Sequence, residues 1–320
     1  MIIPKELINL LKNSTNVAIF SHVRPDGDCL GSASALKSAL NQLGKNVDLY
    51  CDCILSDNYL FIKHMDVLNK PTCINYDLAI VVDCSDEARI GQYIEIYQKA
   101  SHSIKIDHHK TYSDFAEINF VQQVGSTCEI LYFIIKEMGV KIDSDIACAL
   151  YAGISSDTGC FMHNNTTSDA HKIAGELLKV GFNLDIANYN LFKRRTIGQI
   201  NLLKTALNNM KFVSNGKVAI SYLTIKDFKA NNTRNTETYG IVNTLVDIDS
   251  VDIGVLISED KPNLYTCSFR SKGGIDVSQI CQEFGGGGHL NASGCNIFGA
   301  YKNVIDKIEK VVNSYYARIS

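Results

Sequence analysis

Acidic and imidazole side chains recur directly after short apolar runs in the first half of this sequence. The set comprises His22, Asp26, Asp28, Asp83, His108 and Asp157, with Asp107 and His109 adjacent. Carboxylates that share one pocket repel each other unless a cation or a proton lies between them. A single Asp after a strand is explained by capping of the next helix. Several strand ends that each deliver Asp or His favour a metal site instead.

The donor types narrow the choice of metal. Imidazole and carboxylate ligands without thiolate favour Mn²⁺ or Mg²⁺ first, and then Co²⁺ or Fe²⁺. The candidates are too many for one ordinary site, whereas two ions about 3.5–4 Å apart, bridged by one carboxylate, would use them all. Such a pair lowers the pKa of a bridging water and neutralises charge on a phosphoryl group. The sequence therefore predicts hydrolysis at phosphorus.

The elements that position these residues alternate between strands and helices. Strands are expected at 17–20, 47–51, 78–82 and 103–106, and helices at 31–43, 127–138, 144–154 and 168–180. This alternation predicts an α/β fold with a doubly wound, mostly parallel sheet. Ligands of such sheets bind beyond the carboxyl ends of the strands, where the predicted loop at 21–28 lies.

The pattern changes after a polar, helical stretch at 183–210. Longer strands are expected at 217–223, 252–258 and 264–269, and helices at about 277–284 and 304–316, with the glycine run 285–288 between them. We therefore expect a catalytic domain at 1–185, a helical connector at 186–210 and a smaller α/β substrate-binding domain at 211–320. We expect the active site in the cleft between the two domains.

Composition excludes several classes of protein. The chain has 320 residues, of which 46% are hydrophobic and 20% charged, and no apolar run reaches the roughly 18 residues of a membrane span. The N-terminus does not resemble a signal peptide, so we expect a cytoplasmic protein without a membrane partner. The eleven cysteines form no CxxC pair and are expected to be reduced and mostly buried. The formal charge of −3 argues that any bound polyanion is short.

The motifs resemble a known family. The segments His22-Val-Arg-Pro-Asp26-Gly-Asp28, Asp83, Asp107-His108-His109 and Asp157 match, in order, the four motifs of the DHH phosphoesterase superfamily. The segments 269–271, 276–278, 284–289 and 292–294 resemble the DHH-associated nucleic-acid-binding domain of that family. The two-domain length is similar to that of stand-alone bacterial oligoribonucleases and pAp phosphatases.

The resemblance implies a role for each motif residue. One metal ion would be held by His22, Asp26 and Asp83. The other would be held by Asp28, Asp83, His108 and Asp157. Asp83 would then bridge the two ions. His109 would contact the scissile phosphate, and Asp107 would orient the histidine pair.

The resemblance also implies a substrate-binding set, which is Arg270, Gly286, Gly287, Gly288 and His289. Glycines let a phosphate approach backbone amides closely, and an arginine binds phosphate through two hydrogen bonds. Without the family pattern, the glycines also fit a flexible turn, and Arg270 also fits a surface position.

Together these observations predict an enzyme that hydrolyses short oligoribonucleotides to mononucleotides, and pAp to AMP. A hydroxide held between two metal ions would attack the phosphorus, with Mn²⁺ expected and Mg²⁺ or Co²⁺ as alternatives. The expected partners are short RNA or DNA oligonucleotides and small nucleotides, and a homodimer is left open. Two other functions also stay open: a cyclic di-AMP or linear pApA phosphodiesterase, and a non-catalytic nucleotide sensor.

Overall fold

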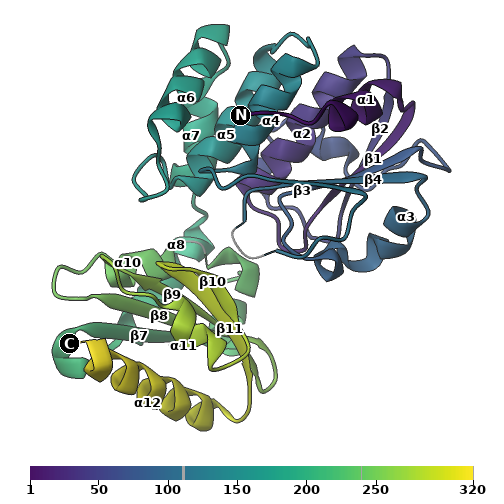
Figure 1. Ribbon diagram of the computed structural model, residues 1–320. Coiled ribbons are helices and arrows are strands. Elements are labelled where there is room, and N and C mark those ends of the chain that lie inside the picture. Colours follow the sequence, from purple (N-terminus) through teal and green to yellow (C-terminus); the bar gives the residue numbers. More distant parts are fainter. Residues whose placement is uncertain (110–111, 239, 320) are drawn as a thin grey trace. The chain divides into compact units, whose positions relative to one another are not determined.

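The computed structural model describes residues 1–109, 112–238 and 240–319, without the side chains of His289 and Ile319. Within these ranges the chain forms two compact units, Met1–Arg194 and Arg195–Ser320 (Figure 1). Each unit has its own sheet and its own hydrophobic core. The predicted fold class, a parallel α/β sheet followed by a second α/β unit, is confirmed.

The first unit is built on five parallel strands. In chain order they are β1 (Asn16–Ser21), β2 (Asn46–Cys51), β3 (Leu78–Val82), β4 (His102–Asp107) and β5 (Ile118–Val121). Their order in space is β2-β1-β3-β4-β5. Because β3 lies between β1 and β4 and all three run the same way, their carboxyl ends lie side by side.

Helices surround this sheet. They are α1 (Lys5–Asn13), α2 (Gly27–Gln42), α3 (Ile94–Gln98), α4 (Thr127–Glu137), α5 (Ser144–Asp157), α6 (Ser168–Val180) and α7 (Leu184–Asn188), which continues as a π-helical turn, Tyr189–Lys193. Three 3-10 turns occur at η1 (Asp57–Tyr59), η2 (Met65–Val67) and η3 (Glu87–Tyr93).

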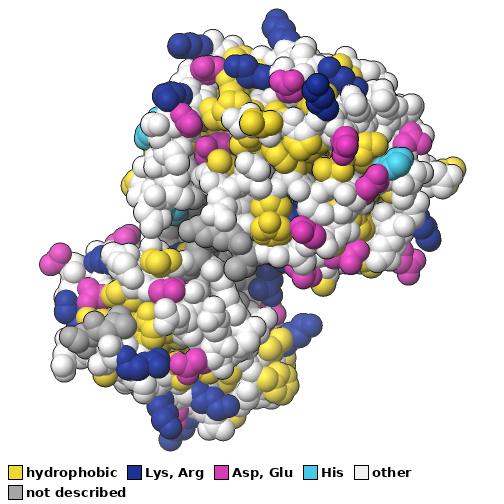
Figure 2. Space-filling view, in the orientation of Figure 1, with side chains coloured by type: hydrophobic (Ala, Val, Ile, Leu, Met, Phe, Trp, Pro, Cys, Tyr) yellow, Lys and Arg dark blue, Asp and Glu magenta, His cyan; other side chains and the backbone are white. Residues whose placement is uncertain are grey.

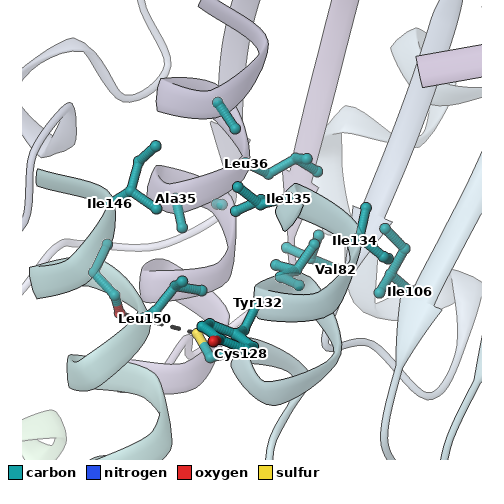
Figure 3. Close-up of a cluster of buried hydrophobic side chains, with 14 of the residues drawn as sticks. Ala35, Leu36, Val82, Ile106, Cys128, Tyr132, Ile134, Ile135, Ile146 and Leu150 are labelled. Atoms are coloured by element: carbon teal, nitrogen blue, oxygen red, sulfur yellow. Dashed lines mark hydrogen bonds between the residues drawn. The ribbon is translucent and has the colours of Figure 1, made fainter. Parts of the chain in front are cut away.

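Both faces of the first sheet are covered. Figure 3 shows the larger core, in which Leu36 of α2, Ile135 of α4 and Leu150 of α5 meet Val82 and Ile106 of the sheet. On the opposite face an aromatic cluster covers the strands, with the ring of Phe20 stacked on Tyr50 and edge-on to Tyr97. Burial on both faces explains why the strands are almost continuously apolar.

Helices α2 and α5 approach each other through glycines. A Cβ atom on Gly31 would lie 2.4 Å from the carbonyl oxygen of Ala149. A Cβ atom on Gly153 would lie 2.2 Å from Cys128 Sγ and 2.6 Å from Asp28 Oδ1. The small residues therefore let α4 and α5 close around the start of α2.

The second unit contains a mixed six-stranded sheet. Its strands are β6 (Lys211–Val213), β7 (Val218–Leu223), β8 (Ile253–Lys261), β9 (Leu264–Ser271), β10 (Gly287–His289) and β11 (Ala292–Phe298), in the spatial order β10-β11-β9-β8-β7-β6. Its helical elements are α8 (Ile197–Asn208), η5 (Ser214–Gly216), α9 (Ile225–Ala230), η6 (Asn235–Glu237), α10 (Ile241–Val246), α11 (Ser278–Gln282) and α12 (Tyr301–Ile319). Only β7 and β8 pair in parallel among these described strands.

Helix α8 is part of the second unit. Leu202 and Ala206 of this helix pack with Leu223 and Phe228 in a small apolar cluster. The hydroxyl of Ser221 on β7 donates to the carbonyl oxygen of Ala206. The helix that the sequence suggested as part of a connector is therefore built into the second unit.

Two helix boundaries differ from the prediction in a way that concerns function. Helix α2 begins at Gly27 instead of residue 31, because the Asp26 side chain accepts hydrogen bonds from the amides of Asp28 and Cys29. Helix α5 continues to Asp157 instead of ending at 154. Asp28 and Asp157 thus lie on helices and not in loops, which restricts their backbones. By contrast, β3 and α6 begin and end at the predicted residues.

The surface and the cysteines fit the composition. Acidic and basic side chains are intermingled on the visible face of each unit (Figure 2). All eleven cysteines are free thiols, and seven of them are buried. Across the described ranges, no helix combines the length and the apolar character needed to cross a bilayer.

We expect the contact between α2 and α5 to be intolerant of a single methyl group. The change Gly31→Ala should lower the free energy of unfolding by about 1–3 kcal/mol, as overpacking does. The matched control is Gly175→Ala on α6, where a Cβ atom would meet nothing within 4 Å. This control should be neutral or raise stability by roughly 0.5–1 kcal/mol, since Ala favours the helix. Urea unfolding followed by circular dichroism measures both changes, and equal effects would contradict the packing argument.

Candidate metal centre

The predicted ligands converge at the carboxyl ends of three neighbouring strands. His22 directly follows β1, Asp83 directly follows β3, and His108 directly follows β4. Asp28 reaches the same place from the first turn of α2, and Asp157 from the last residue of α5. Asp28 is completely buried, and Asp83 and His108 are nearly so.

Asp83 lies at the centre of the group. Its Oδ2 is 3.6 Å from His22 Nε2, and its Oδ1 is 3.5 Å from His108 Nε2. The same His108 nitrogen is 3.0 Å from Asp157 Oδ2 and 3.9 Å from Asp28 Oδ2. The two oxygens of one carboxylate therefore face two different histidines, which is the arrangement required of a bridging ligand.

The backbone of Asp83 has an uncommon conformation. Its φ of 55° is left-handed, and its amide donates to the carbonyl oxygen of Ile106 on β4. Asp and Asn tolerate this region better than most residues because their short polar side chains bond locally. The turn after β3 thus aims the carboxylate across the strand ends.

The tautomer of each histidine follows from the hydrogen bond that its Nδ1 atom makes. His22 Nδ1 donates to the carbonyl oxygen of Val23 at 2.8 Å, and His108 Nδ1 donates to that of Val124 at 3.2 Å. Arg89 Nη2, which can only donate, is 3.1 Å from His22 Nδ1, and the tautomer is assigned from the carbonyl contact because it is the shorter of the two. In both rings Nε2 is the nitrogen directed at Asp83, as in histidines that bind metals.

Negative charge is concentrated in this pocket. Burial and the charges of Asp83 and Asp157 raise the pKa of Asp28 well above its usual range. Burial likewise raises the pKa of Asp157 to about 6, although the hydrogen bond with His108 opposes it. Burial alone would lower the pKa of His108, but the hydrogen bond with Asp157 and the charge of Asp83 raise it well above normal. The carboxylates therefore favour a positive charge between them.

The spacing of the donor atoms suits divalent ions. Ligands about 2.1 Å from an octahedral ion are about 3.0 Å apart when adjacent and about 4.2 Å apart when opposite. The distances from His108 Nε2 to Asp157 Oδ2 and Asp28 Oδ2, 3.0 and 3.9 Å, fall within this range. Among the described residues, three groups have donor atoms within 4.8 Å of one another: His22–Cys29–Asp83, Asp83–His108–His109 and Asp28–His108–Asp157.

Asp26 differs from the other predicted ligands. Its Oδ1 caps α2, accepting from the amides of Asp28 at 3.0 Å and Cys29 at 3.1 Å. It belongs to none of the three donor groups. Cys29, which the sequence did not suggest as a ligand, takes the place expected for Asp26 in the donor group with His22 and Asp83. The Cys29 thiol accepts from the His22 amide and donates to the carbonyl oxygen of Val82.

Asp107 organises the second histidine of the pair. Its Oδ1 accepts from His109 Nδ1 at 2.7 Å and from the amide of His108 at 2.9 Å. Its Oδ2 is 3.2 Å from the ammonium group of Lys105, and both side chains are fully buried. Despite burial, the hydrogen bond with His109 and the charges of His109 and Lys105 hold the pKa of Asp107 below its usual range.

Lys105 is a residue that the sequence analysis overlooked. It was included in a strand, but a lysine inside an apolar run is a signal, since lysine is almost never fully buried unless it is paired. Its ammonium group also donates to the carbonyl oxygen of Ser113 and lies over the ring of Phe115. Because alternate strand residues share a face, Lys105 and Asp107 meet on the same side of β4.

The predicted substrate-binding residues lie in the second unit. In the strand register, His289 of β10 is opposite Ala292 of β11, which is opposite Arg270 of β9. Arg270 Nη1 donates to the carbonyl oxygen of Phe269. The side chain of His289 lies outside the described part of the chain.

The glycine run is not simply a flexible turn. Gly287 and Gly288 form β10 with His289. A Cβ atom on Gly286 would lie 2.3 Å from the carbonyl oxygen of Gly294, and one on Gly288 2.6 Å from that of Ala292. Close packing against β11 therefore requires glycine at these two positions, whereas a Cβ atom on Gly287 would meet nothing within 4 Å.

Comparison with known proteins agrees with this geometry. Residues 16–154 match the DHH family, N-terminal domain, and residues 215–318 match the DHHA1 domain. The bifunctional oligoribonuclease and PAP phosphatase NrnA of Mycoplasma genitalium is 30% identical over 299 residues, which cover 91% of this chain and 92% of that protein. The chain belongs to the DHH family. The resemblance seen in the sequence is confirmed, and the protein is a hydrolase of phosphate ester bonds.

Other proteins are similar over most of this chain. The probable bifunctional oligoribonuclease and PAP phosphatase NrnA of Streptococcus mutans is 29% identical over 313 residues, covering 93% of this chain and 95% of that protein. An exopolyphosphatase-related protein from Bacteroides fragilis has the same fold, with a TM-score of 0.88, 24% identity, and coverage of 97% and 95%. RecJ of Thermus thermophilus, crystallised with Mn²⁺, has a TM-score of 0.54 and 14% identity, with coverage of 98% and 54%.

Removing one member of the buried ion pair Lys105–Asp107 should destabilise the protein strongly. We expect Lys105→Met to lower the free energy of unfolding by about 3–5 kcal/mol, because it leaves a buried carboxylate unpaired. Adding Asp107→Asn removes that charge, so the double variant should lose less than the single one. Urea unfolding of the metal-free protein at neutral pH compares the two. A double variant that is less stable than Lys105→Met would show that the pair is not coupled.

Proposed function

We propose that this DHH protein hydrolyses short oligoribonucleotides to mononucleotides, and pAp to AMP, with the aid of two divalent ions. The observation that carries the proposal is the central position of Asp83, whose two carboxylate oxygens face His22 and His108. The similarity to proteins named oligoribonuclease and PAP phosphatase over nearly the whole chain supports the choice of substrates. The cytoplasmic location expected from the sequence is part of this proposal.

Residues 1–185 would hold the ions. We assign one ion to His22, Asp26 and Asp83, and the other to Asp28, Asp83, His108 and Asp157. Asp26 would bind while it caps α2, since a carboxylate accepts at two oxygens. Nitrogen and oxygen donors favour Mn²⁺, with Mg²⁺ or Co²⁺ as alternatives. When bound, two such ions lower the pKa of a water between them and neutralise charge on a phosphoryl oxygen.

His109 and Asp107 would act on the substrate side of this centre. The hydrogen bond from His109 Nδ1 to Asp107 fixes the orientation of the ring. A ring that carries a proton on both nitrogens would donate through Nε2 to a phosphate oxygen. Lys105 compensates the charge of Asp107 from the other side. In this arrangement His109 stabilises negative charge that develops on the phosphate.

Residues 211–320 would bind the rest of a short substrate. We assign this role to Arg270, Gly286, Gly287, Gly288 and His289. The register supports it, because His289, Ala292 and Arg270 lie in one row across three strands. The open position beside Gly287 would let a phosphate approach the backbone. A formal charge of −3 agrees with a substrate of few nucleotides.

A panel of substrates tests the proposed activity. With Mn²⁺, the full-length protein should hydrolyse RNA dimers to decamers and pAp faster than cyclic di-AMP, and chelation with EDTA should abolish turnover. Initial rates measured side by side give the result. Faster hydrolysis of cyclic di-AMP would identify a cyclic dinucleotide phosphodiesterase instead. Tight binding without turnover of any substrate would identify a nucleotide sensor.

Asp83 gives the sharpest test of the metal assignment. Asp83→Asn keeps the shape of the side chain and tolerates the left-handed backbone, but it removes the bridging charge. We expect turnover to fall by more than about 100-fold, beyond the 10–100-fold typical of residues outside the first coordination sphere. The control is Asp86→Asn, an exposed cap of η3, which should retain activity because Asn caps as well as Asp. An active Asp83→Asn variant would refute the bridging role.

A further inference from the structure

The turn that leads into α4 lies against the ligands of the proposed metal centre, although the sequence analysis assigned it no role. This segment, Val124–Glu129, contains Ser126, which caps α4 by accepting from the amide of Glu129. The inference below rests on the proposed function, since it concerns how this segment positions the metal ligands.

Backbone amides of the first turn of α4 hold Asp28. The amide of Thr127 donates to Asp28 Oδ2 at 2.6 Å, and the amide of Cys128 donates to Oδ1 at 2.9 Å. The first amides of a helix have no partner within the helix and carry partial positive charge, so they suit a carboxylate. Both contacts come from the main chain, and they therefore fix Asp28 whatever side chain stands at 127 or 128.

The hydroxyl of Thr127 holds the central carboxylate. It donates to Asp83 Oδ1 at 3.0 Å, and the Thr127 side chain is fully buried. Oδ1 is the oxygen of Asp83 that faces His108 Nε2. A β-branched side chain at the start of a helix has few rotamers, so the donor is held in place before any ion binds. Thr127 thus contacts both Asp28 and Asp83, one through its amide and one through its hydroxyl.

The same turn fixes the histidine and the last aspartate. The carbonyl oxygen of Val124 accepts from His108 Nδ1. Next to it, the buried carboxyl group of Glu129 lies against the backbone of Gly125. The side-chain amide of Asn165 donates to the carbonyl oxygens of Gly125 at 3.1 Å and Asp157 at 3.2 Å. Asn165 therefore holds the turn by a hydrogen bond and links it to Asp157, while Glu129 packs against Gly125.

The position of Gly125 is constrained by this arrangement. A Cβ atom there would lie 2.3 Å from Glu129 Oε1 and 3.1 Å from the carbonyl oxygen of Asn165. Glycine is therefore required for Glu129 and Asn165 to close on the same point of the backbone. One short segment connects four of the expected ligands, which are Asp28, Asp83, His108 and Asp157.

We propose that Val124–Glu129 is a positioning element for the metal pair, and that the hydroxyl of Thr127 sets the orientation of the bridging carboxylate of Asp83. Thr127 is a positioning residue, not a ligand. Without its hydroxyl, the carboxylate can rotate away from the geometry that serves both ions, while Asp28 stays held by the backbone amides.

The test compares substitutions that differ by one hydroxyl. Thr127→Val has nearly the same shape as the natural residue but no donor, whereas Thr127→Ser keeps the donor. We expect Thr127→Val to weaken Mn²⁺ binding and to lower kcat, each by about 10–100-fold, as loss of an outer-shell partner does. Thr127→Ser should remain within about 3-fold of the natural protein, which is below that range. KM for a short RNA should change less than kcat, because Thr127 does not contact substrate.

Mn²⁺ titration of the full-length protein by calorimetry and electron paramagnetic resonance gives the affinity independently of turnover. The matched control is Thr244→Val on α10, whose hydroxyl donates to the carbonyl oxygen of Gly240 within the second unit. If Thr127→Val does not fold, as judged by circular dichroism, Thr127→Ala takes its place. Thr127→Ala and Thr127→Ser also differ by one hydroxyl, so they make the same comparison.

The outcomes separate the two claims. If the natural protein neither binds Mn²⁺ nor hydrolyses any nucleotide with it, the proposed function fails. If the natural protein is active and Thr127→Val, or Thr127→Ala in its place, matches it in Mn²⁺ affinity and kcat, the positioning role of Thr127 is refuted while the proposed function stands. Equal losses in the Ser and Val variants would also refute it, because the hydroxyl would then not be the cause.

Discussion

The repulsion among buried carboxylates is the constraint on which the rest of this structure depends. Asp28, Asp83 and Asp157 lie around one histidine nitrogen, and burial raises the pKa of Asp28 and Asp157. Three negative charges cannot share a dry pocket without compensation. Against the effect of burial, Asp157 and Asp83 raise the pKa of His108, and divalent ions would compensate the carboxylates more strongly.

The fold holds these groups together by contacts that leave them little freedom. Parallel strand ends deliver His22, Asp83 and His108, and the amides at the start of α4 hold Asp28. Gly153 lets α5 pass against Asp28. Because each of these proposed ligands is held by a different element, the stability of the sheet and the geometry of the group depend on the same packing. A metal site formed by these groups would be set before metal or substrate arrives, which is what electrostatic catalysis requires.

Much of this arrangement was predictable from the sequence. Burial on both faces makes a parallel strand continuously apolar, so β3 and the Asp83 that follows it were evident. The start of α2 was misplaced because Pro25 and Gly27 suggested a turn, whereas the Asp26 side chain caps the helix directly. Asp26 thus caps α2 and is also an expected metal ligand. The spacing of residues in the sequence does not distinguish a capping aspartate from a metal-binding one.

Other residues were beyond sequence reasoning for physical reasons. Lys105 required knowledge of which face of β4 meets the aromatic cluster, although its place in an apolar run was a usable signal. The contact of Thr127 with Asp83 joins residues that are 44 positions apart and depends on how α4 packs on the sheet. The glycine run 285–288 suggested phosphate binding, yet Gly286 and Gly288 are explained by packing against β11. Close packing of two strands through glycine gives no periodic pattern by which the sequence would reveal it.

The most direct test is anomalous X-ray diffraction from crystals of the full-length protein grown with Mn²⁺. The account predicts two peaks about 3.5–4 Å apart, one on each side of the Asp83 carboxylate. A single peak that does not touch Asp83, or no peak near the carboxyl ends of β1, β3 and β4, would contradict it.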